Sequence, residues 1–366
     1  MDTILVVAPP SVNMDDVLDR YEVKAKPSRM AVTSKLIHDG NPETPIHIFA
    51  TPQLFDTVII AKEFPMLYAT HFTLSWIAHL CLNFSKNGTI AIEVPNPKAN
   101  KNNRKITQEY IEENLANATV EMRDHWLTIS NIDAQNIPKS VFSVVSKNLA
   151  EVQKTFKVDQ NNQGGVVAHL EDGPERFLAY SLQGAWNKSF LLEKFIFEKF
   201  GGRKVTLTDM GGGSCFIAAE LALRGHKINV IEKNPDYLAI GQDIVNRLDI
   251  SDKVRLTLGD FKNIQENSDV IYFFETLLYA PRNETGEIIK RCAENLNSGG
   301  FLLIRELSKD VATKQNNDFD AMFYCDELKD LLVENIGQPE PYNIFTGGGN
   351  DWEKARKSVL LLKVDV

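Results

Sequence analysis

Short apolar runs alternate with amphipathic stretches along this chain, a pattern that predicts strands alternating with helices. In the second half, β-branched and aromatic runs predict five strands, at residues 205–208, 228–231, 254–258, 269–274 and 301–305. Apolar positions at helical spacing predict helices between them, over residues 214–224, 235–248 and 285–296, and a later one over 325–334. Strands are also expected near residues 342–345 and 358–364.

The first half of the chain shows the same alternation. Strands are predicted at residues 3–8, 46–50, 57–61, 89–94 and 119–129, and helices at 72–84, 105–115 and 139–156. A polar, glycine-ended stretch at 159–165 is the best linker, and an aromatic-rich helix is expected over 177–200. We therefore predict an N-terminal α/β domain over residues 1–135, a connecting helix and linker over 136–165, and a second domain over 166–366.

The chemically most informative stretch is residues 205–225. A β-branched run passes through three consecutive glycines, Gly211 to Gly213, and becomes an apolar helix that Gly225 can close. Glycines let a backbone turn sharply and approach a ligand without a Cβ, while the following helix N-terminus offers amides. This is the opening of a nucleotide-binding α/β unit.

Carboxylates follow the next two predicted strands. Glu232 stands at the end of the second strand, 19 residues after Gly213, where it can bind both hydroxyls of a ribose. Asn234 and Pro235 then cap and start a helix. The third strand ends in Gly-Asp260-Phe, so Asp260 could accept from an exocyclic amine and Phe261 could pack on a base.

Asp209-Met-Gly-Gly-Gly213, Glu232 and Gly259-Asp260 together resemble the cofactor site of class I S-adenosylmethionine-dependent methyltransferases. The resemblance covers roughly residues 175–366 and implies a Rossmann-like sheet closed by a C-terminal antiparallel hairpin. It implies S-adenosylmethionine as cofactor, with Glu232 on the ribose and Asp260 on the adenine. The other cofactor-binding residues that it implies are Asp209, Gly211, Gly212, Gly213, Lys233, Phe261 and Tyr180. Cys215 stands where the family often has a third spaced glycine, which predicts slight crowding there.

A dinucleotide site is the main rival interpretation. The NAD fingerprint G-x-G-x-x-G fails at Phe216, where close helix-to-strand packing asks for glycine. NAD binding also leaves Asp209 and the Gly-Asp after the third strand unexplained. The sequence therefore favours S-adenosylmethionine.

An internal similarity links the two halves. Residues 56–69 and 82–92 echo residues 268–280 and 294–304 at an offset of about 212, which pairs Glu63 with Glu275 and Gly88 with Gly300. We interpret the N-terminal domain as a degenerate copy of the later half of the methyltransferase sheet; chance similarity is the alternative. Its first strand runs into two prolines, which lack an N–H, so we expect it to bind no cofactor. A lid, a substrate wall or a homodimer surface would be its role.

Composition and net charge make some classes of binding partner less favourable. A net charge of −9 disfavours a nucleic-acid backbone as partner, and no apolar run approaches the length of a membrane span. The four cysteines are scattered and the histidines form no ligand motif, so we expect no metal site and a reducing cytoplasm.

If the methyl group of the cofactor is already activated, the protein mainly has to hold the methyl donor and the acceptor in line. If a proton must leave the acceptor, Glu275 at the end of the fourth strand is the first choice of base, with Tyr279 and His169 behind it. A plain ligand or helix-capping role for Glu275 is equally open. Tyr180, Gln183 and Trp186 could line the pocket, although an aromatic stripe at helical spacing is more often core.

Three functions follow from the resemblance. The first is methyl transfer to a small-molecule acceptor. The second is transfer of the aminobutyrate arm of S-adenosylmethionine, as in nicotianamine-synthase-like enzymes. The third is a scaffold or sensor that binds the cofactor without turnover.

Overall fold

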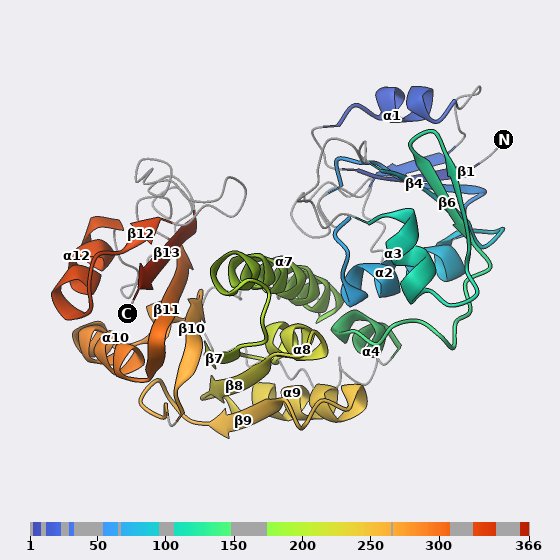
Figure 1. The fold of residues 1–366 in the computed structure, drawn as a ribbon. Coiled ribbons are helices and arrows are strands. Elements are labelled where there is room, and N and C mark those ends of the chain that lie inside the picture. The colour runs from blue at the N-terminus through green and yellow to red at the C-terminus, as the bar shows by residue number, and fades with distance from the viewer. Residues whose placement is uncertain are drawn as a thin grey trace. The chain divides into compact units, whose positions relative to one another are not determined.

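The computed structural model describes residues 3–8, 12–22, 29–32, 54–64, 67–94, 106–147, 174–264, 266–307, 325–341 and 359–365. The chain divides into two compact units. Unit 1 comprises Met1–Gln153 with Asp172–Gln183, and unit 2 comprises Lys154–Glu171 with Gly184–Val366. Each unit is built on its own β-sheet, in the order of elements shown in Figure 1.

Unit 2 contains a seven-stranded sheet in the order β12-β13-β11-β10-β7-β8-β9. The five strands from β9 to β11 are parallel, whereas β13 is antiparallel to β11 and β12 is antiparallel to β13. This arrangement confirms the predicted α/β class with a Rossmann-like parallel core. The strands are β7 (Thr206–Met210), β8 (Lys227–Glu232), β9 (Val254–Leu258), β10 (Ser268–Phe274), β11 (Leu296–Leu307), β12 (Glu340–Pro341) and β13 (Val359–Asp365).

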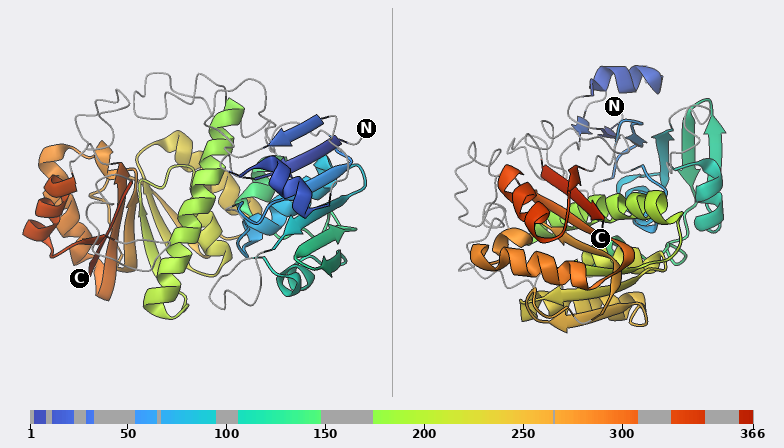
Figure 2. Two further views of the ribbon diagram at one scale, coloured as in Figure 1. Left: turned by 90° about the horizontal axis from the view of Figure 1, so that it is seen from above. Right: turned by 60° about the vertical axis from the view of Figure 1, so that its left-hand side comes forward.

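Helices cover both faces of this sheet, with α10 and α12 on one side and α7, α8 and α9 on the other (Figure 2). Successive residues of a strand point to opposite faces, so one strand can pack against helices on both sides. On one face, Ile271 and Phe273 of β10 join the buried cluster that includes Ile289 of α10 and Leu328 of α12. The helices are α7 (Pro174–Phe200), α8 (Phe216–Leu223), α9 (Pro235–Leu248), α10 (Thr285–Glu294) and α12 (Cys325–Asn335), with short turns η2 (Leu277–Tyr279) and η3 (Arg282–Glu284).

Local signals account for the helix after β8. The Asn234 side chain accepts from the Asp236 amide at 2.9 Å, and Pro235 occupies the first turn, where its missing N–H costs nothing. The helix stops at Asp249, whose φ of 59° is left-handed. The apolar positions Ile240, Ile244, Val245 and Leu248 are all buried, so the predicted amphipathic stripe faces the interior.

Unit 1 contains a six-stranded sheet in the order β2-β1-β3-β4-β6-β5. Strands β2, β1, β3 and β4 are parallel, β6 is antiparallel to β4, and β5 is antiparallel to β6. Its elements are β1 (Thr3–Val7), α1 (Met14–Arg20), β2 (Arg29–Val32), β3 (Thr57–Ile60), α2 (His71–Phe84), β4 (Thr89–Glu93), α3 (Gln108–Asn114), β5 (Thr119–Arg123), β6 (Trp126–Ser130) and α4 (Val141–Lys147).

One strand prediction in unit 1 was wrong. Residues 119–129 form two strands, β5 and β6, joined by a tight turn at Asp124 and His125. Asp124 has a φ of 54°, which a hairpin turn of this length requires, but the pair lacks the glycine that usually marks such a turn. Strand β2 was not predicted. The predicted strands at 46–50 and 342–345, the linker at 159–165 and His169 lie outside the described residues.

No helix among the described residues is long and apolar enough to cross a membrane.

Candidate functional site

The triple-glycine bend connects the end of β7 to α8. The amides of Gly211 and Gly212 donate to the Ile231 carbonyl at 2.8 and 3.3 Å, which ties the bend to β8. A Cβ on Gly212 would collide with the Val230 side chain, whereas one on Gly213 would meet nothing within 4 Å. The bend therefore needs Gly212 for packing, and Gly213 leaves its outer surface open.

Glu232 ends β8 directly beneath this bend. Its side chain is 7% exposed; Oε2 accepts from the Gly213 amide and Oε1 from the Asn234 amide, each at 2.8 Å. A carboxylate has about four lone-pair sites, so two of them remain for further donors. The amides of Gly211, Gly212 and Gly213 are thus used within the protein, and Glu232 carries the remaining hydrogen-bonding capacity.

Cys215 follows the bend at the N-cap of α8, in a left-handed conformation with φ of 61°. Its side chain is fully buried, and burial raises the thiol pKa well above its usual value. The sulfur lies where a Cβ on Gly241 of α9 would be, so this glycine makes room for the cysteine. The predicted crowding is relieved by Gly241, which the sequence marks only as a glycine inside a helix.

Asp209 lies inside the sheet, one residue before the end of β7. It is 2% exposed, and burial raises its pKa to about 7. It pairs in register with Tyr272 of β10. The neighbouring Tyr272 hydroxyl and the Lys188 charge both act to lower the Asp209 pKa, but they do not outweigh burial. A carboxyl group whose burial is only partly compensated therefore lies under the glycine bend.

Glu275 directly follows β10 and has a left-handed φ of 62°. Its carboxylate contacts Lys188 of α7 at 3.0 Å and pairs with Arg305 of β11. Burial raises the pKa of Glu275, but the two cations together outweigh burial and bring the pKa below its usual value. Lys188 and Arg305 were not predicted, because nothing in their sequence surroundings marks them.

Glu306 is the last residue but one of β11 and lies beside this ion pair. It is 5% exposed, and its Oε1 accepts from the Thr276 and Leu277 amides at 2.8 and 2.7 Å. Its Oε2 has no partner among the described residues, and burial raises its pKa to about 8. Thr276 in turn donates to the Met210 carbonyl at 2.6 Å, so the turn after β10 is fixed to β7.

Asp260 and Phe261 stand at the end of β9. Asp260 is exposed and its Oδ1 accepts from the Lys262 amide at 2.8 Å. Phe261 is half-buried and packs on Phe273 with ring centroids 5.5 Å apart. The carboxyl ends of β7, β8 and β9 thus bring Asp209, Glu232 and Asp260 to one edge of the sheet, as parallel strands must.

The remaining predicted residues lie around this edge. Lys233 is exposed, with its ammonium 5.8 Å from the Tyr279 ring centre. Tyr279 is 40% exposed, and partial burial raises its pKa. Trp186 is 1% exposed and stacks on Phe190 at 6.0 Å between ring centroids, which places it in the core. Tyr180 and Gln183 belong to α7, but their side chains are outside the described part of the structure.

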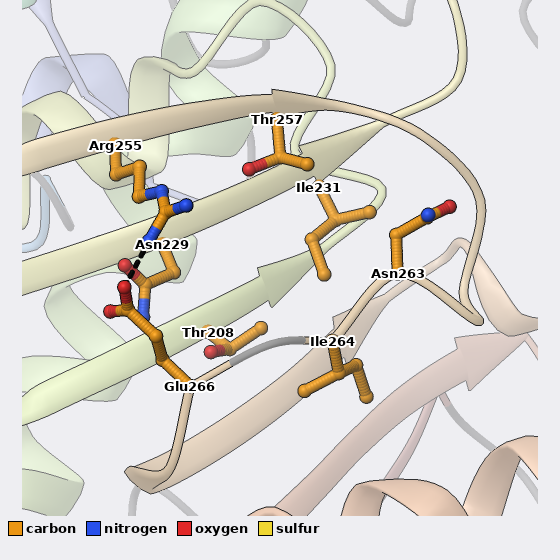
Figure 3. A pocket seen from close by; sticks show the side chains of 8 residues that line it. All are labelled: Thr208, Asn229, Ile231, Arg255, Thr257, Asn263, Ile264 and Glu266. Atoms are coloured by element: carbon orange, nitrogen blue, oxygen red, sulfur yellow. Dashed lines mark hydrogen bonds and ion pairs between the residues drawn. The ribbon is translucent and has the colours of Figure 1, made fainter.

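A separate hollow lies on the face of β7, β8 and β9 (Figure 3). The chain from 259 to 267 leads from β9 to β10, and its described residues, 259–264 with 266 and 267, form no helix, although such crossovers between parallel strands usually contain one. The hollow is lined by Thr208, Asn229, Ile231, Arg255, Thr257, Asn263, Ile264 and Glu266, and it includes none of the acidic residues of the sheet edge.

No family model and no curated protein matches the sequence, but many solved structures are similar in fold. The plantazolicin methyltransferase BpumL, solved with SAH, is 13% identical with a TM-score of 0.40; the match covers 60% of this chain and 97% of BpumL. The magnesium protoporphyrin IX methyltransferase ChlM of Synechocystis PCC 6803, solved with bound SAH, is 11% identical with a TM-score of 0.41 over 52% of this chain and 87% of ChlM.

TehB from Haemophilus influenzae is 19% identical with a TM-score of 0.35, over 47% of this chain and 65% of TehB. The chain therefore spans less than two thirds of TehB. At these identities the likeness is one of fold alone, and the chemistry has to follow from the residues at the site.

Proposed function

We propose that unit 2 binds S-adenosylmethionine and transfers its methyl group to a small-molecule acceptor. The observation that carries this proposal is the position of Glu232. Its two oxygens are held at 2.8 Å by the Gly213 and Asn234 amides, at the end of the strand next to the glycine bend. The carboxylate is therefore oriented in advance toward two adjacent hydroxyls, such as those of a ribose.

The charges at the sheet edge suit this cofactor. When bound, S-adenosylmethionine supplies a methyl group on a positively charged sulfur. Asp209 is buried, and a nearby cation would stabilise its ionised form. Gly213 offers open space in place of a side chain, and Asp260 lies at the end of the adjoining strand as a hydrogen-bond acceptor for adenine.

The protein's contribution to the transfer is to position the reactants. Glu232 and the glycine bend would fix the nucleoside, while the turn after β10, tied to β7 by Thr276, would shape the acceptor side. Holding two reactants in line can lower a barrier by roughly 7–11 kcal/mol. No metal is required for this chemistry.

Calorimetry tests the cofactor, and mass spectrometry tests the reaction. S-adenosylmethionine and S-adenosylhomocysteine should bind the full chain in a 1:1 ratio, and NADH should not. Incubation with a cell extract should then release S-adenosylhomocysteine. Methylthioadenosine instead would indicate aminobutyrate transfer, and tight binding with neither product would indicate a scaffold or sensor. Binding of NADH alone would overturn the proposal.

We infer that the sheet of unit 1 is a second copy of the unit 2 sheet without a cofactor site. The order β2-β1-β3-β4-β6-β5 corresponds to β8-β7-β10-β11-β13-β12. The pairing registers of the strands correspond as well. In unit 1, Ile4 of β1 pairs with Thr57 of β3. In unit 2, Leu207 of β7 pairs with Val270 of β10 at the equivalent position. In this view β12 and β13 are the closing antiparallel pair that the resemblance implies.

A hydrogen bond at the start of the central strands supports the same inference. The Thr3 amide donates to Asp56 at 2.7 Å, and the Thr206 amide donates to Asp269 at 2.9 Å. The offset is 203 residues for the threonines (206 − 3) and 213 for the aspartates (269 − 56). The aspartate offset of 213 therefore aligns Lys62 with Glu275, whereas the sequence comparison aligned Glu63 with Glu275.

The corresponding strand ends carry opposite charges in the two units. Lys62 after β3 lies 3.2 Å from Glu93 of β4, whereas Glu275 after β10 pairs with Arg305 of β11. Arg20 of α1 also contacts Glu93 at 2.7 Å. In unit 1 the buried carboxylate is thus neutralised by cations of its own chain, which favours a structural role over cofactor binding.

A further inference from the structure

The carboxyl ends of β7, β8, β10 and β11 carry Asp209, Glu232, Glu275 and Glu306, four carboxyl groups at one edge of the sheet. Lys188 and Arg305 lie among them, and both pair with Glu275. One oxygen of Glu306 is left without a partner among the described residues, although the side chain is 95% buried from solvent (5% exposed). Buried polar atoms are usually hydrogen-bonded, so we expect this oxygen to bind a hydrogen-bond donor.

Glu306 lies on the side of the edge where an acceptor would enter. Glu232 and the glycine bend belong to β8 and β7, and the sheet continues from β7 through β10 to β11. A nucleoside held at β8 with its reacting end near β7 would present that end toward β10 and β11. Glu275 directly follows β10, and Glu306 is the last residue but one of β11.

The same place already accepts an alkylammonium group. The Lys188 ammonium lies 3.0 Å from Glu275 Oε2, and its charge also acts on Glu306 and Asp209. Glu306 Oε1 is fixed by two backbone amides, so its free oxygen has a defined position. The geometry therefore suits an ammonium ligand, which can donate to both the Glu306 and the Glu275 carboxylates.

We propose that the acceptor is a primary or secondary amine, and that Glu306 and Glu275 bind its ammonium group in the place that Lys188 occupies. Glu306 is then the base of the reaction. This inference rests on the proposed cofactor, and it replaces Glu275 as base, because Glu275 is already neutralised by two cations.

The step balances with one proton transfer. The charge of the bound ammonium favours the ionised form of Glu306. The acceptor ammonium then gives a proton to the Glu306 carboxylate, which becomes a carboxylic acid, and the nitrogen lone pair is freed. That lone pair forms the new bond to the methyl carbon as the carbon–sulfur bond breaks with its electron pair moving to sulfur. The products are a methylated ammonium and neutral S-adenosylhomocysteine.

Binding can be measured without turnover. n-Propylammonium chloride, sodium propionate and 1-propanol are titrated by calorimetry into the full chain saturated with S-adenosylhomocysteine. Only n-propylammonium should bind. Glu306→Gln keeps the oxygen that the two amides need and should weaken n-propylammonium binding about 10- to 100-fold, the equivalent of one charge-assisted hydrogen bond. Glu287→Gln, on the exposed face of α10, is the control and should change nothing.

Lys188→Met gives an outcome that a merely structural lysine would not produce. If the Lys188 ammonium occupies the subsite, removing it should tighten n-propylammonium binding about tenfold or more, since the competing cation is gone. Unchanged or weaker binding would overturn the inference. So would failure of n-propylammonium to bind, or preference for propionate.

Transfer of a deuterated methyl group separates this inference from the proposed function. S-adenosylmethionine carrying CD3 is incubated with the protein and a cell extract, and labelled products are identified by mass. Labelled amines support the inference, whereas labelled alcohols or carboxylates overturn it and leave the proposed function intact. Failure of S-adenosylhomocysteine to bind in calorimetry would instead overturn the proposed function.

Discussion

Glu232 Oε2 accepts from the Gly213 amide at 2.8 Å, so the acid that ends β8 also fixes the bend that follows β7. The two residues are 19 positions apart in the chain, yet they form one wall at the sheet edge. A ligand bound to the Glu232 carboxylate would therefore lie next to the open surface of Gly213.

Replacing Glu232 by alanine should weaken S-adenosylhomocysteine binding severely. Two charge-assisted hydrogen bonds to a ribose would be lost, each worth about 1.5–3 kcal/mol, and the Gly213 and Asn234 amides would lose their acceptor. Calorimetry measures the change, and circular dichroism checks that the fold persists. Unchanged affinity in a folded variant would count against the cofactor assignment.

Alanine at the two neighbouring glycines should act differently. Gly212→Ala places a Cβ against Val230 and should destabilise unit 2 by about 1–3 kcal/mol. Gly213→Ala meets nothing in the protein, so its stability loss should be limited to about 1–2 kcal/mol for the left-handed φ of 53°, while S-adenosylhomocysteine affinity drops. Urea unfolding and calorimetry on both variants separate the two effects; equal affinity losses would contradict this division.

Stability of unit 2 should fall as the pH rises from about 5 to 8. Burial raises the pKa of Asp209 to about 7 and that of Glu306 to about 8, above the unfolded values of roughly 4. The folded state therefore binds these protons more tightly, and this stabilisation is lost as each group ionises. Thermal midpoints across this range should show the slope, and Asp209→Asn and Glu306→Gln should each flatten it. A slope of opposite sign, or one unchanged in both variants, would contradict the assignment.

Glu93→Gln should destabilise unit 1 without changing cofactor affinity. Glu93 is fully buried and contacts Arg20 at 2.7 Å and Lys62 at 3.2 Å. Removing its charge leaves Arg20 with Glu63, which it contacts at 3.2 Å, so the expected cost is about 1.5–3 kcal/mol, that of a hydrogen bond to a charged group. Denaturant unfolding should show the loss, and S-adenosylhomocysteine should bind the folded variant as it binds the parent protein.

Gly241→Ala should destabilise the packing of α8 on α9. The added Cβ would collide with the Cys215 sulfur, an overpacking that costs about 1–3 kcal/mol. Cys215→Gly tolerates the left-handed φ of 61° and removes that sulfur, so the double variant should recover most of the loss. Additive losses in urea unfolding would show that the two residues do not share this space.

Local signals made much of unit 2 predictable from sequence. The predicted strand 254–258 has the same bounds as β9, and the Asn234-Pro235 start of α9 was found because capping chemistry is local. The β5–β6 turn was missed because Asp124 adopts its positive φ without a following glycine. The residue propensities of this segment do not indicate a left-handed backbone conformation at Asp124.

Residues of the candidate site could be predicted from the sequence where they lie at or just after the carboxyl end of a strand. Asp209, Glu232 and Asp260 do lie at one sheet edge, since parallel strands place their carboxyl ends together. The environment of Glu275 was not predictable, because Lys188 comes from a helix 87 residues earlier in the chain. Glu306 was visible only as an acid after a strand; its burial depends on the turn formed by Thr276 and Leu277.

The inferred correspondence of the two sheets places opposite charges at matching strand ends. Lys62 with Glu93 and Glu275 with Arg305 are mirror images in sign. A one-step exchange at either position would set two like charges side by side, which destabilises neighbouring strands. If both sheets descend from one ancestor, at least one copy has exchanged these signs since the duplication, and a path through a neutral residue at one of the two positions avoids the like-charge pair.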